Sequence, residues 1–340
     1  MRDPELRVLE SFKPPRKTTN PYIVMLYSAL QKACDVHAFS WREALRGDYD
    51  VFHVHWPEVL LRSDRRSRRV GRRIAFWLFL ARLKSRRVAV VRTMHNLKPH
   101  ENPSKIDRKL LARLDAMTTA WIRLNPVTEP NEHADVTTIL LGHYLDWFDE
   151  IPDVEVEPGL IGNFGLIRPY KGVPELVSTV RQSSDPHIRL VVMGEPISLD
   201  LEQQIRDIAG ADPRISLHLS HVDDATLARE VRRCSYVALP HENMHNSSSL
   251  LLALSLDRPA LVPNTPVTRD IQSEVGPQWV YLYDELTAAT LEDAAQRSRD
   301  DEREPHPDLS KRDWTRVADD HVAVFRRALA VARSDSSHAQ

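Results

Sequence analysis

The sequence has 340 residues, of which 42% are hydrophobic and 28% charged, and its formal net charge at pH 7 is −2. These values are typical of a soluble globular protein with two domains, and they argue against a chain that binds polyanions over its whole surface. Cys34 and Cys234 lie far apart, so we expect a reducing compartment, no disulfide framework and no cysteine zinc site. The N-terminus lacks the apolar core of a signal peptide, and no apolar run reaches the roughly 18 residues of a spanning helix, which favours a cytoplasmic location.

A first strand is expected at 6–12 and a first helix at 21–32, with a basic, proline-bearing loop between them. In a parallel α/β sheet such a loop opens at the carboxyl edge, where ligands bind. Thr18, Thr19 and Asn20 are therefore candidates for contact with a substrate. Capping of the following helix by the same side chains is the alternative, and general helix chemistry favours it.

A second strand is expected at 35–39, and a third leads into His55 and Trp56. Strand alternation places His53 and His55 on one face of the sheet. Because neither a cysteine nor a further histidine stands at ligand spacing, we expect no metal site. Glu58 lies just beyond the strand end, where a carboxylate can face a substrate.

Residues 62–87 contain eleven lysines and arginines but one acid, and residues 74–81 in their middle are apolar and aromatic. Cations that flank such a helical segment are typical of a helix lying on an anionic lipid surface. The alternative is a core helix with a basic, solvated face. Nucleic-acid binding is disfavoured, because the aromatic residues form one apolar block and no stacking module is evident.

Residues 88–94 are expected to form a buried strand, and His95 follows directly at its end. A lone histidine in such a place is more often structural than functional. A helix at 105–117, a strand at 119–124 and a short segment at 137–141 complete this half of the chain.

The remaining sequence alternates between apolar runs and helical patterns, which predicts a doubly wound parallel sheet. Strands are expected at 160–166, 188–193, 215–219, 236–239, 260–263 and 280–283, and helices near 173–182, 199–209, 224–233, 248–256, 267–274, 285–298 and 314–331. Acidic residues and prolines before this half indicate a linker. The expected organisation is a first domain at 1–145, a linker at 146–158, a second domain at 159–312 and a terminal helix at 313–333.

A glycine-bearing loop after the strand at 160–166 contains Gly165, Arg168 and Lys171. Its glycines let the backbone approach a ligand, and its two cations suit an anion. Gly194 follows the next strand, beside Glu195, and is expected near the same ligand. A solvated surface turn is the alternative interpretation of the two cations.

A second polar loop follows the strand at 236–239 and begins a helix. Asn246 or Ser247 can cap this helix, and the first N–H groups of a helix have no internal partners, so its N-terminus favours anions. The hydroxyls of Ser247, Ser248 and Ser249 lie at the same end. A serine run that merely caps a helix is the alternative.

Together the two loops resemble the nucleotide-sugar half of GT-B glycosyltransferases. Residues 252–262 (LALSLDRPALV) stand where that family usually has Glu-Ala-Met-Ala-x-Gly-x-Pro-Val-Val. Retaining members place two glutamates eight positions apart here, whereas this chain has Met244 and Leu252, and Glu242 is out of register. The Asn-Ser-Ser-Ser version is similar to bacterial exopolysaccharide transferases, including inverting β-mannosyltransferases of xanthan-type pathways.

The resemblance implies a GT-B fold, with two Rossmann-like domains, and hexosyl transfer from a nucleoside-diphosphate sugar, with GDP-mannose as the favoured donor. It implies no metal or other cofactor, a lipid-linked or polysaccharide acceptor, a position at the inner face of the plasma membrane through 62–87, and no nucleic-acid partner. Inversion needs a base, for which Glu58 and His95 are the candidates. A sugar-nucleotide epimerase or hydrolase of the same fold, or a non-catalytic nucleotide-sugar-binding protein, is the alternative.

The implied site residues fall into two groups. The acceptor side comprises Thr18, Thr19, Asn20, His55 and Trp56. The donor side comprises Gly165, Arg168, Lys171, Gly194, Glu195, Glu242, Asn246, Ser247, Ser248 and Ser249.

Overall fold

The computed structural model describes residues 3–16, 19–63, 65–95, 104–128, 135–148, 152, 154–241, 244, 246 and 248–334. The chain forms two compact units. Unit 1 comprises Met1–Gly142 and Lys311–Gln340, and unit 2 comprises His143–Ser310. The terminal helix therefore packs with the first half of the chain, and each unit is described by itself below.

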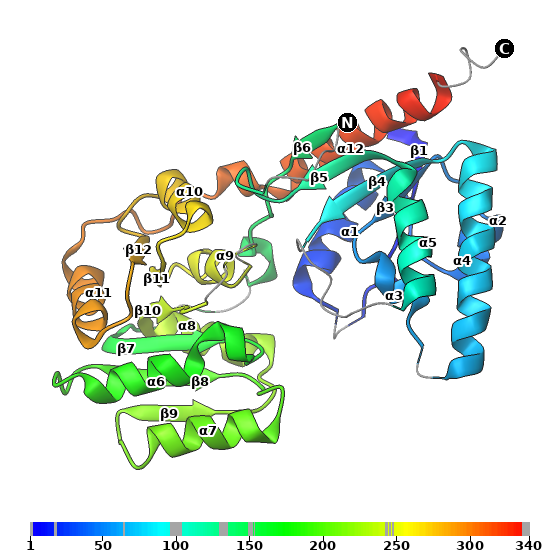
Figure 1. Cartoon of the computed structure of the whole chain (residues 1–340). Coiled ribbons are helices and arrows are strands. Elements are labelled where there is room, and N and C mark those ends of the chain that lie inside the picture. Colours follow the sequence, from blue (N-terminus) through cyan, green and yellow to red (C-terminus); the bar gives the residue numbers. More distant parts are fainter. Residues whose placement is uncertain are drawn as a thin grey trace. The chain divides into compact units, whose positions relative to one another are not determined.

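Unit 1 contains a six-stranded sheet in the order β2-β1-β3-β4-β5-β6, and all of its strand pairs are parallel (Figure 1). Its strands are β1 (Asp3–Glu10), β2 (Cys34–His37), β3 (Val51–Val54), β4 (Ala89–Met94), β5 (Thr118–Arg123) and β6 (Val136–Thr138). Its helices are α1 (Pro21–Ala33), α2 (Trp41–Arg46), α3 (Pro57–Leu61), α4 (Arg66–Arg86), α5 (Lys105–Ala116), α12 (Trp314–Ser334) and the 3-10 turn η3 (Ser310–Arg312), whose first residue belongs to unit 2.

Helices cover both faces of this sheet because the buried side chains of each strand alternate in direction. Phe52 and Val54 of β3 join a hydrophobic cluster with residues of α4 and α5, including Phe79 and Leu114. The opposite face meets α12, where Phe325 packs against the ring of His53. One face of the sheet is therefore closed by an ordinary hydrocarbon core, and the other contains polar side chains.

Unit 2 repeats the architecture with the strand order β12-β11-β10-β7-β8-β9, again all parallel. Its strands are β7 (Glu157–Phe164), β8 (Arg189–Met193), β9 (Ile215–His218), β10 (Cys234–Ala238), β11 (Ala260–Pro263) and β12 (Val280–Tyr283). Its helices are η1 (Leu145–Trp147), η2 (Pro169–Lys171), α6 (Val173–Gln182), α7 (Leu199–Ala209), α8 (Asp224–Arg233), α9 (Ser248–Ser255), α10 (Pro266–Val275) and α11 (Ala288–Asp300).

The two parallel, doubly wound sheets predicted from the sequence are confirmed. Two short helices, α2 and α3, were not expected, because five or six residues do not establish a helical period. Ser40 caps α2, and Pro57 begins α3, which ends β3 earlier than the apolar pattern indicated. Among the described residues, no helix combines the length and apolar character needed to cross a membrane.

Candidate functional site

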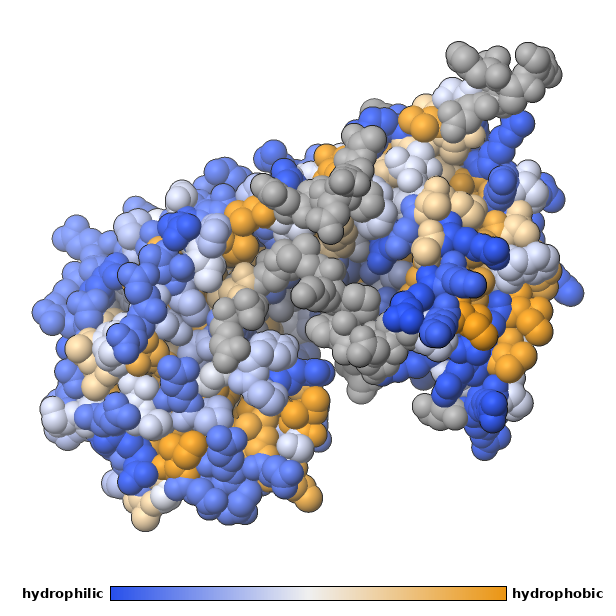
Figure 2. Space-filling model, viewed as in Figure 1, coloured by the Kyte–Doolittle hydropathy of each residue, from blue (hydrophilic) through white to orange (hydrophobic). Residues whose placement is uncertain are grey.

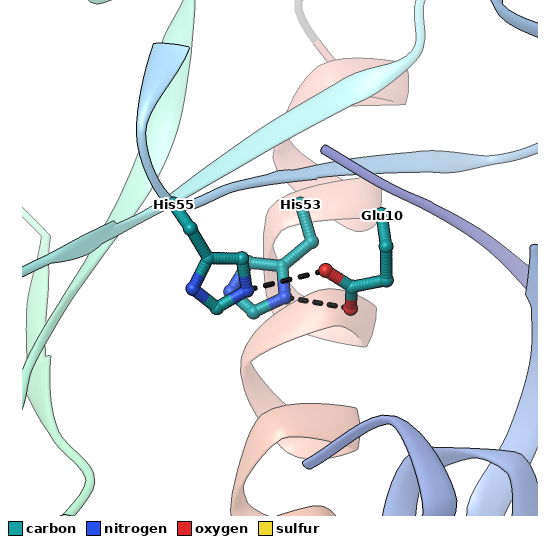
Figure 3. A group of neighbouring side chains, drawn as sticks. All are labelled: Glu10, His53 and His55. Atoms are coloured by element: carbon teal, nitrogen blue, oxygen red, sulfur yellow. Dashed lines mark hydrogen bonds and ion pairs between the residues drawn. The ribbon is translucent and has the colours of Figure 1, made fainter. Parts of the chain in front are cut away.

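A buried polar cluster lies at the carboxyl end of strands β1 and β3 in unit 1. Glu10 is the last residue of β1 and stands directly beside His53 in the parallel register. Its carboxylate accepts hydrogen bonds from His53 Nδ1 at 2.9 Å and from His55 Nε2 at 3.2 Å. Figure 3 shows both imidazoles turned toward the two carboxylate oxygens. One buried carboxylate therefore orients His53 of the neighbouring strand β3 and His55 just beyond the end of that strand.

His95 joins the cluster from the end of β4. Its Nε2 lies 2.8 Å from Nδ1 of His55. Its ring stacks on Trp56, with the centroids 4.0 Å apart and the planes 24° from parallel. The Tyr22 ring makes a T-shaped contact with it, with the centroids 5.4 Å apart. The half-buried His95 ring is thus held by a hydrogen bond and by aromatic contacts on two sides.

Burial dominates the electrostatics of these histidines. Desolvation lowers the pKa of His55 to about 4, and it lowers the pKa of His95 well below the ordinary value, with the neighbouring histidines adding to the shift. His321 of α12 lies beside His53 and has a pKa lowered to about 3, again mainly by burial. Burial alone would raise the pKa of Glu10, but interactions with His53 and His55 outweigh it and lower the pKa. The cluster therefore contains an ionised carboxylate, and the imidazoles of His55, His95 and His321 beside it favour the neutral form.

The cluster also has the donor atoms of a metal site, since ligand atoms of Glu10, His53 and His55 all lie within 4.8 Å of one another. Hydrogen bonds already account for these atoms. Two ring N–H groups point at the carboxylate, and Nε2 of His53 lies 2.8 Å from the Thr93 hydroxyl. A nitrogen that carries a proton cannot ligate a metal, so we interpret the group as a hydrogen-bonded network.

The other residues proposed for the first half lie near its strand ends. Glu58 is half-buried in the first turn of α3, and its charge acts on Arg92. Asn20 caps α1, accepting a hydrogen bond from the Tyr22 N–H at 3.0 Å. The Thr19 hydroxyl accepts one from the Arg16 N–H at 2.8 Å. The capping expected of Asn20 is confirmed, whereas Thr18 lies outside the described residues.

Unit 2 brings two glycines together at the carboxyl ends of β7 and β8. Gly165 and Gly194 have φ angles of +94° and +151°, which disfavour other residues. A Cβ at Gly194 would lie 2.1 Å from the Gly165 carbonyl oxygen. The Gly165 N–H donates to the Met193 carbonyl at 2.9 Å. Exposed Glu195 contributes its carbonyl to the same loop, accepting from the Ile167 N–H at 2.9 Å.

A concentration of positive charge sits on this pair of loops. A Cβ at Gly165 would lie 3.3 Å from Lys171 Nζ, so the ammonium lies over the glycine. Burial, and then the charge of Arg168, lower the pKa of Lys171 to about 8. Within the described part of the chain, neither the Lys171 ammonium nor the Arg168 guanidinium makes a hydrogen bond or an ion pair. Two neighbouring cations without a counter-ion indicate a binding site for an anion.

His241 lies close to the same cations, after β10. It is 7% exposed, and its Nε2 has no hydrogen-bond partner among the described residues. Burial, together with the Lys171 charge, lowers its pKa to about 3. The imidazole is therefore neutral, and an anion with a proton or a hydroxyl would satisfy its buried nitrogen.

The second loop is described in part. Met244 is buried, Asn246 is half-buried, and Ser248 and Ser249 form the first turn of α9. The Ser248 N–H donates to the Asn246 carbonyl at 3.0 Å. Glu242 and Ser247 lie outside the described residues. The roles proposed for this loop therefore stay predictions.

Several residues of these clusters could not be found from the sequence. In the sequence, Glu10 is an ordinary residue of a predicted strand. Only the register of β1 against β3, which pairs Glu10 with His53, makes it a partner of two histidines. His321 lies in the terminal helix, far along the chain. His241 had one usable signal, its position directly after a predicted strand and Pro240. All three residues join their clusters through contacts between segments that lie far apart in the sequence.

No protein-family model matches the chain. Two curated relatives from Xanthomonas campestris pv. campestris, both named GDP-mannose:glycolipid 4-beta-D-mannosyltransferase, are 43% identical to it over 327 residues, covering 96% of this chain and 93% of theirs. Among solved structures, Anabaena HepE in complex with UDP matches with a TM-score of 0.59 and 12% identity over 99% of this chain and 98% of that one. The catalytic domain of Arabidopsis thaliana starch synthase IV, bound to ADP and acarbose, matches with a TM-score of 0.65 and 10% identity over 96% and 99%. The expected GT-B fold is confirmed.

Proposed function

The chain belongs to the GDP-mannose:glycolipid 4-beta-D-mannosyltransferase family, and we propose that it transfers mannose from GDP-mannose to a 4-hydroxyl of a lipid-linked sugar, forming a β-linkage. The observation that carries this proposal is the 43% identity over 96% of the chain. A β-linkage made from an α-linked donor requires inversion, which agrees with Met244 and Leu252 standing where retaining enzymes have glutamates.

The donor diphosphate is assigned to the loops of unit 2. Lys171 and Arg168 supply two cations that have no counter-ion among the described residues, and Gly165 and Gly194 keep the backbone open beside them. These groups would stabilise the charge that develops on the leaving diphosphate. Such stabilisation is the work that a metal ion performs in other transferases, so we expect transfer to persist in the presence of a chelator.

The base that deprotonates the acceptor hydroxyl is assigned to unit 1, and His95 is the stronger candidate. Its imidazole is neutral and is held in place by His55 and Trp56. General bases act from such fixed positions. Glu58 remains the second candidate, because it lies just beyond the end of β3 as His95 lies just beyond the end of β4. For His55, which is 3% exposed, we propose a supporting role and not contact with the acceptor.

The test of this function is the reaction itself. The purified protein is incubated with GDP-mannose and a glycolipid whose terminal sugar has a free 4-hydroxyl, and the anomeric proton of the product is observed by NMR. A β-mannoside is the expected product, and the matching 4-deoxy glycolipid should give none. An α-mannoside, or transfer from UDP-glucose but not from GDP-mannose, would overturn the proposal.

The anionic membrane surface is proposed to contact α4 of unit 1. Val70, Ile74, Trp77 and Leu78 are all about half exposed and follow one another at helical spacing. Figure 2 shows apolar groups among strongly hydrophilic ones over the region of α4. Exposed arginines precede this stripe, and among the described residues Arg65, Arg66 and Arg68 make no ion pair. Apolar residues beside free cations are what an interfacial helix needs.

Vesicle binding tests the membrane proposal. The protein should sediment with anionic vesicles and be released as salt rises, because exposed charges are screened. Replacement of Arg65, Arg66, Arg68 and Arg69 by Gln should weaken binding by about 1 kcal/mol per residue. The matched control neutralises four exposed arginines of unit 2, namely Arg181, Arg206, Arg229 and Arg299. Equal binding of wild type to neutral and anionic vesicles would exclude the electrostatic contribution.

A further inference from the structure

The buried imidazole of His241 belongs to the carboxyl edge of the sheet in unit 2, just after β10. Strand β10 pairs in parallel with β7, so the chain that leaves β10 emerges beside the loop that leaves β7. The His241 backbone N–H donates to the Leu239 carbonyl at 2.8 Å, and this three-residue bond turns the chain at Pro240. The strand pairing and the turn therefore put His241 at the edge that also carries Lys171.

A close contact between the two loops brings these residues near each other. Gly172, which directly follows Lys171, has a φ angle of +64°, and a Cβ there would lie 2.4 Å from the Pro240 carbonyl oxygen. Only a glycine allows the two backbones to approach so closely. Lys171 and His241 stand next to this contact on its two sides, and the charge of Lys171 acts on the imidazole. A small ligand at this place can therefore meet both side chains.

Both side chains lack polar partners within the described part of the chain. His241 is 7% exposed, and its Nε2 makes no hydrogen bond there. The Lys171 ammonium makes neither a hydrogen bond nor an ion pair with any described residue. Buried polar groups of native proteins are nearly always paired, so this exception beside a cation indicates a ligand. A neutral imidazole has one proton, and with that proton on Nε2 it can donate to an ionised phosphate, which only accepts.

We propose that His241 is a donor-binding residue, whose Nε2–H donates a hydrogen bond to a diphosphate oxygen of GDP-mannose beside the Lys171 ammonium. This inference rests on the proposed donor site of unit 2 and adds an uncharged residue to it. A neutral group suits this place, because burial and the Lys171 charge lower the pKa of His241 to about 3 and so disfavour a further cation. The ammonium attracts the anion from any direction, whereas the ring N–H selects one oxygen.

The first test separates a binding role from a structural one. His241→Leu removes a buried polar atom that has no partner among the described residues, so the melting temperature of the ligand-free protein should stay the same or rise. The affinity for GDP, measured by calorimetry, should fall by about 10–100-fold, because a hydrogen bond to a charged group is lost. His241→Gln keeps an N–H at the end of its side chain and should stay within about threefold of wild type. A lower melting temperature of His241→Leu with unchanged GDP affinity would overturn the inference.

The second test uses the wild-type protein and identifies the ligand group. The ¹⁵N chemical shifts of labelled histidines report which ring nitrogen carries the proton, and the His241 signal is assigned by its loss in His241→Gln. Saturation with GDP or with inorganic pyrophosphate should shift this signal and show the proton on Nε2, whereas free mannose should not. A shift with GDP-mannose but not with GDP would assign the nitrogen to a sugar hydroxyl and overturn the phosphate contact. A shift caused by Glu242→Gln without ligand, with none caused by GDP, would assign it to that carboxylate instead.

The matched control is His187→Leu, which makes the same replacement at an exposed histidine of unit 2 that precedes β8. It should change neither the melting temperature nor the affinity for GDP. Weaker GDP binding in Lys171→Ala, with unchanged binding in His241→Leu, would overturn this inference alone. A wild-type protein that does not bind GDP would instead overturn the proposed donor site, and with it the function on which this inference rests.

Discussion

The two units have the same parallel six-stranded architecture but carry opposite chemistry at the carboxyl edges of their strands. In unit 1 that edge holds the carboxylate of Glu10 with His55 and His95, whose pKa values burial lowers. In unit 2 it holds glycines with positive φ and two cations that form no ion pair within the described part of the chain. The fold thus determines where a ligand can bind, at the edge of the sheet where the loops meet. The side chains at the strand ends determine which ligand can bind there.

The division matches the two tasks that we propose for the protein as an inverting transferase. Proton transfer needs a neutral base in a fixed orientation, and burial with a carboxylate nearby provides it in unit 1. Binding and departure of a diphosphate need positive charge and an open backbone, which unit 2 provides. Substitutions in one unit should therefore change the rate, and substitutions in the other should change donor affinity.

The largest expected effect is on catalysis. His95→Ala should lower kcat by about 10²–10⁴-fold, because it removes a general base. The Kd of GDP-mannose, measured by calorimetry, should change by less than about twofold, since we assign the diphosphate contacts to unit 2. Glu58→Gln is the parallel variant. If Glu58→Gln abolishes transfer and His95→Ala does not, the base is Glu58.

The next effect is on stability in acid. The pKa values of His55, His95 and His321 in unit 1 are lowered, as is that of His241 in unit 2. As the pH falls below about 6.5, these groups take up protons in the unfolded chain but stay neutral in the folded one. The free energy of unfolding therefore has its full value above that pH and decreases as the pH falls, down to about 4 in the case of His55. Each contributes about 1.4 kcal/mol per pH unit.

The acid stability of the two units can be measured separately. Unit 1 has three such histidines and unit 2 has one among the described residues, so hydrogen exchange should show unit 1 losing protection more steeply between pH 6.5 and 5. His321→Gln keeps an N–H for the Val317 carbonyl. It should reduce the slope of the unfolding free energy of unit 1 against pH by the contribution of one proton. Equal slopes in both units would contradict the assignment of neutral histidines to unit 1.

Donor affinity should respond to unit 2. Lys171→Ala and Arg168→Ala should each weaken GDP binding by about 1.5–3 kcal/mol, because a charge-assisted contact with phosphate is lost. Calorimetry with GDP measures the change. Arg299→Ala, at an exposed site in α11, is the matched loss of charge and should have no effect. Unchanged affinity in both loop variants would place the diphosphate elsewhere.

The smallest effect is the pH dependence of the same affinity. The pKa of Lys171 is about 8 in the free protein, and a bound diphosphate favours the protonated ammonium. Affinity should therefore be constant below pH 8 and fall by up to about tenfold per pH unit above it. Lys171→Arg should remove this fall, because arginine stays charged throughout. A decline that persists in Lys171→Arg would have to come from another group.

Much of this protein follows from the sequence alone. The order of strands and helices could be predicted because apolar runs alternate with helical patterns, and all six strands of unit 2 lie where those runs stand. The loop with Arg168 and Lys171 could be recognised because its glycines and cations are neighbours in the chain. Placing His53 and His55 on one face needed only the period of a strand.

The tertiary structure decided what depends on segments far apart. Glu10 became the partner of two histidines through the register of β1 against β3, and a shift of one residue would turn its side chain to the other face. The lowered pKa values of Lys171 and His95 depend on burial and on neighbours that only folding assembles. The sequence by itself thus determined the elements and the local motifs, since these arise from interactions between near neighbours. Hydrogen-bond partners and charge states were determined by the tertiary structure, because they arise from contacts between distant residues that exclude water.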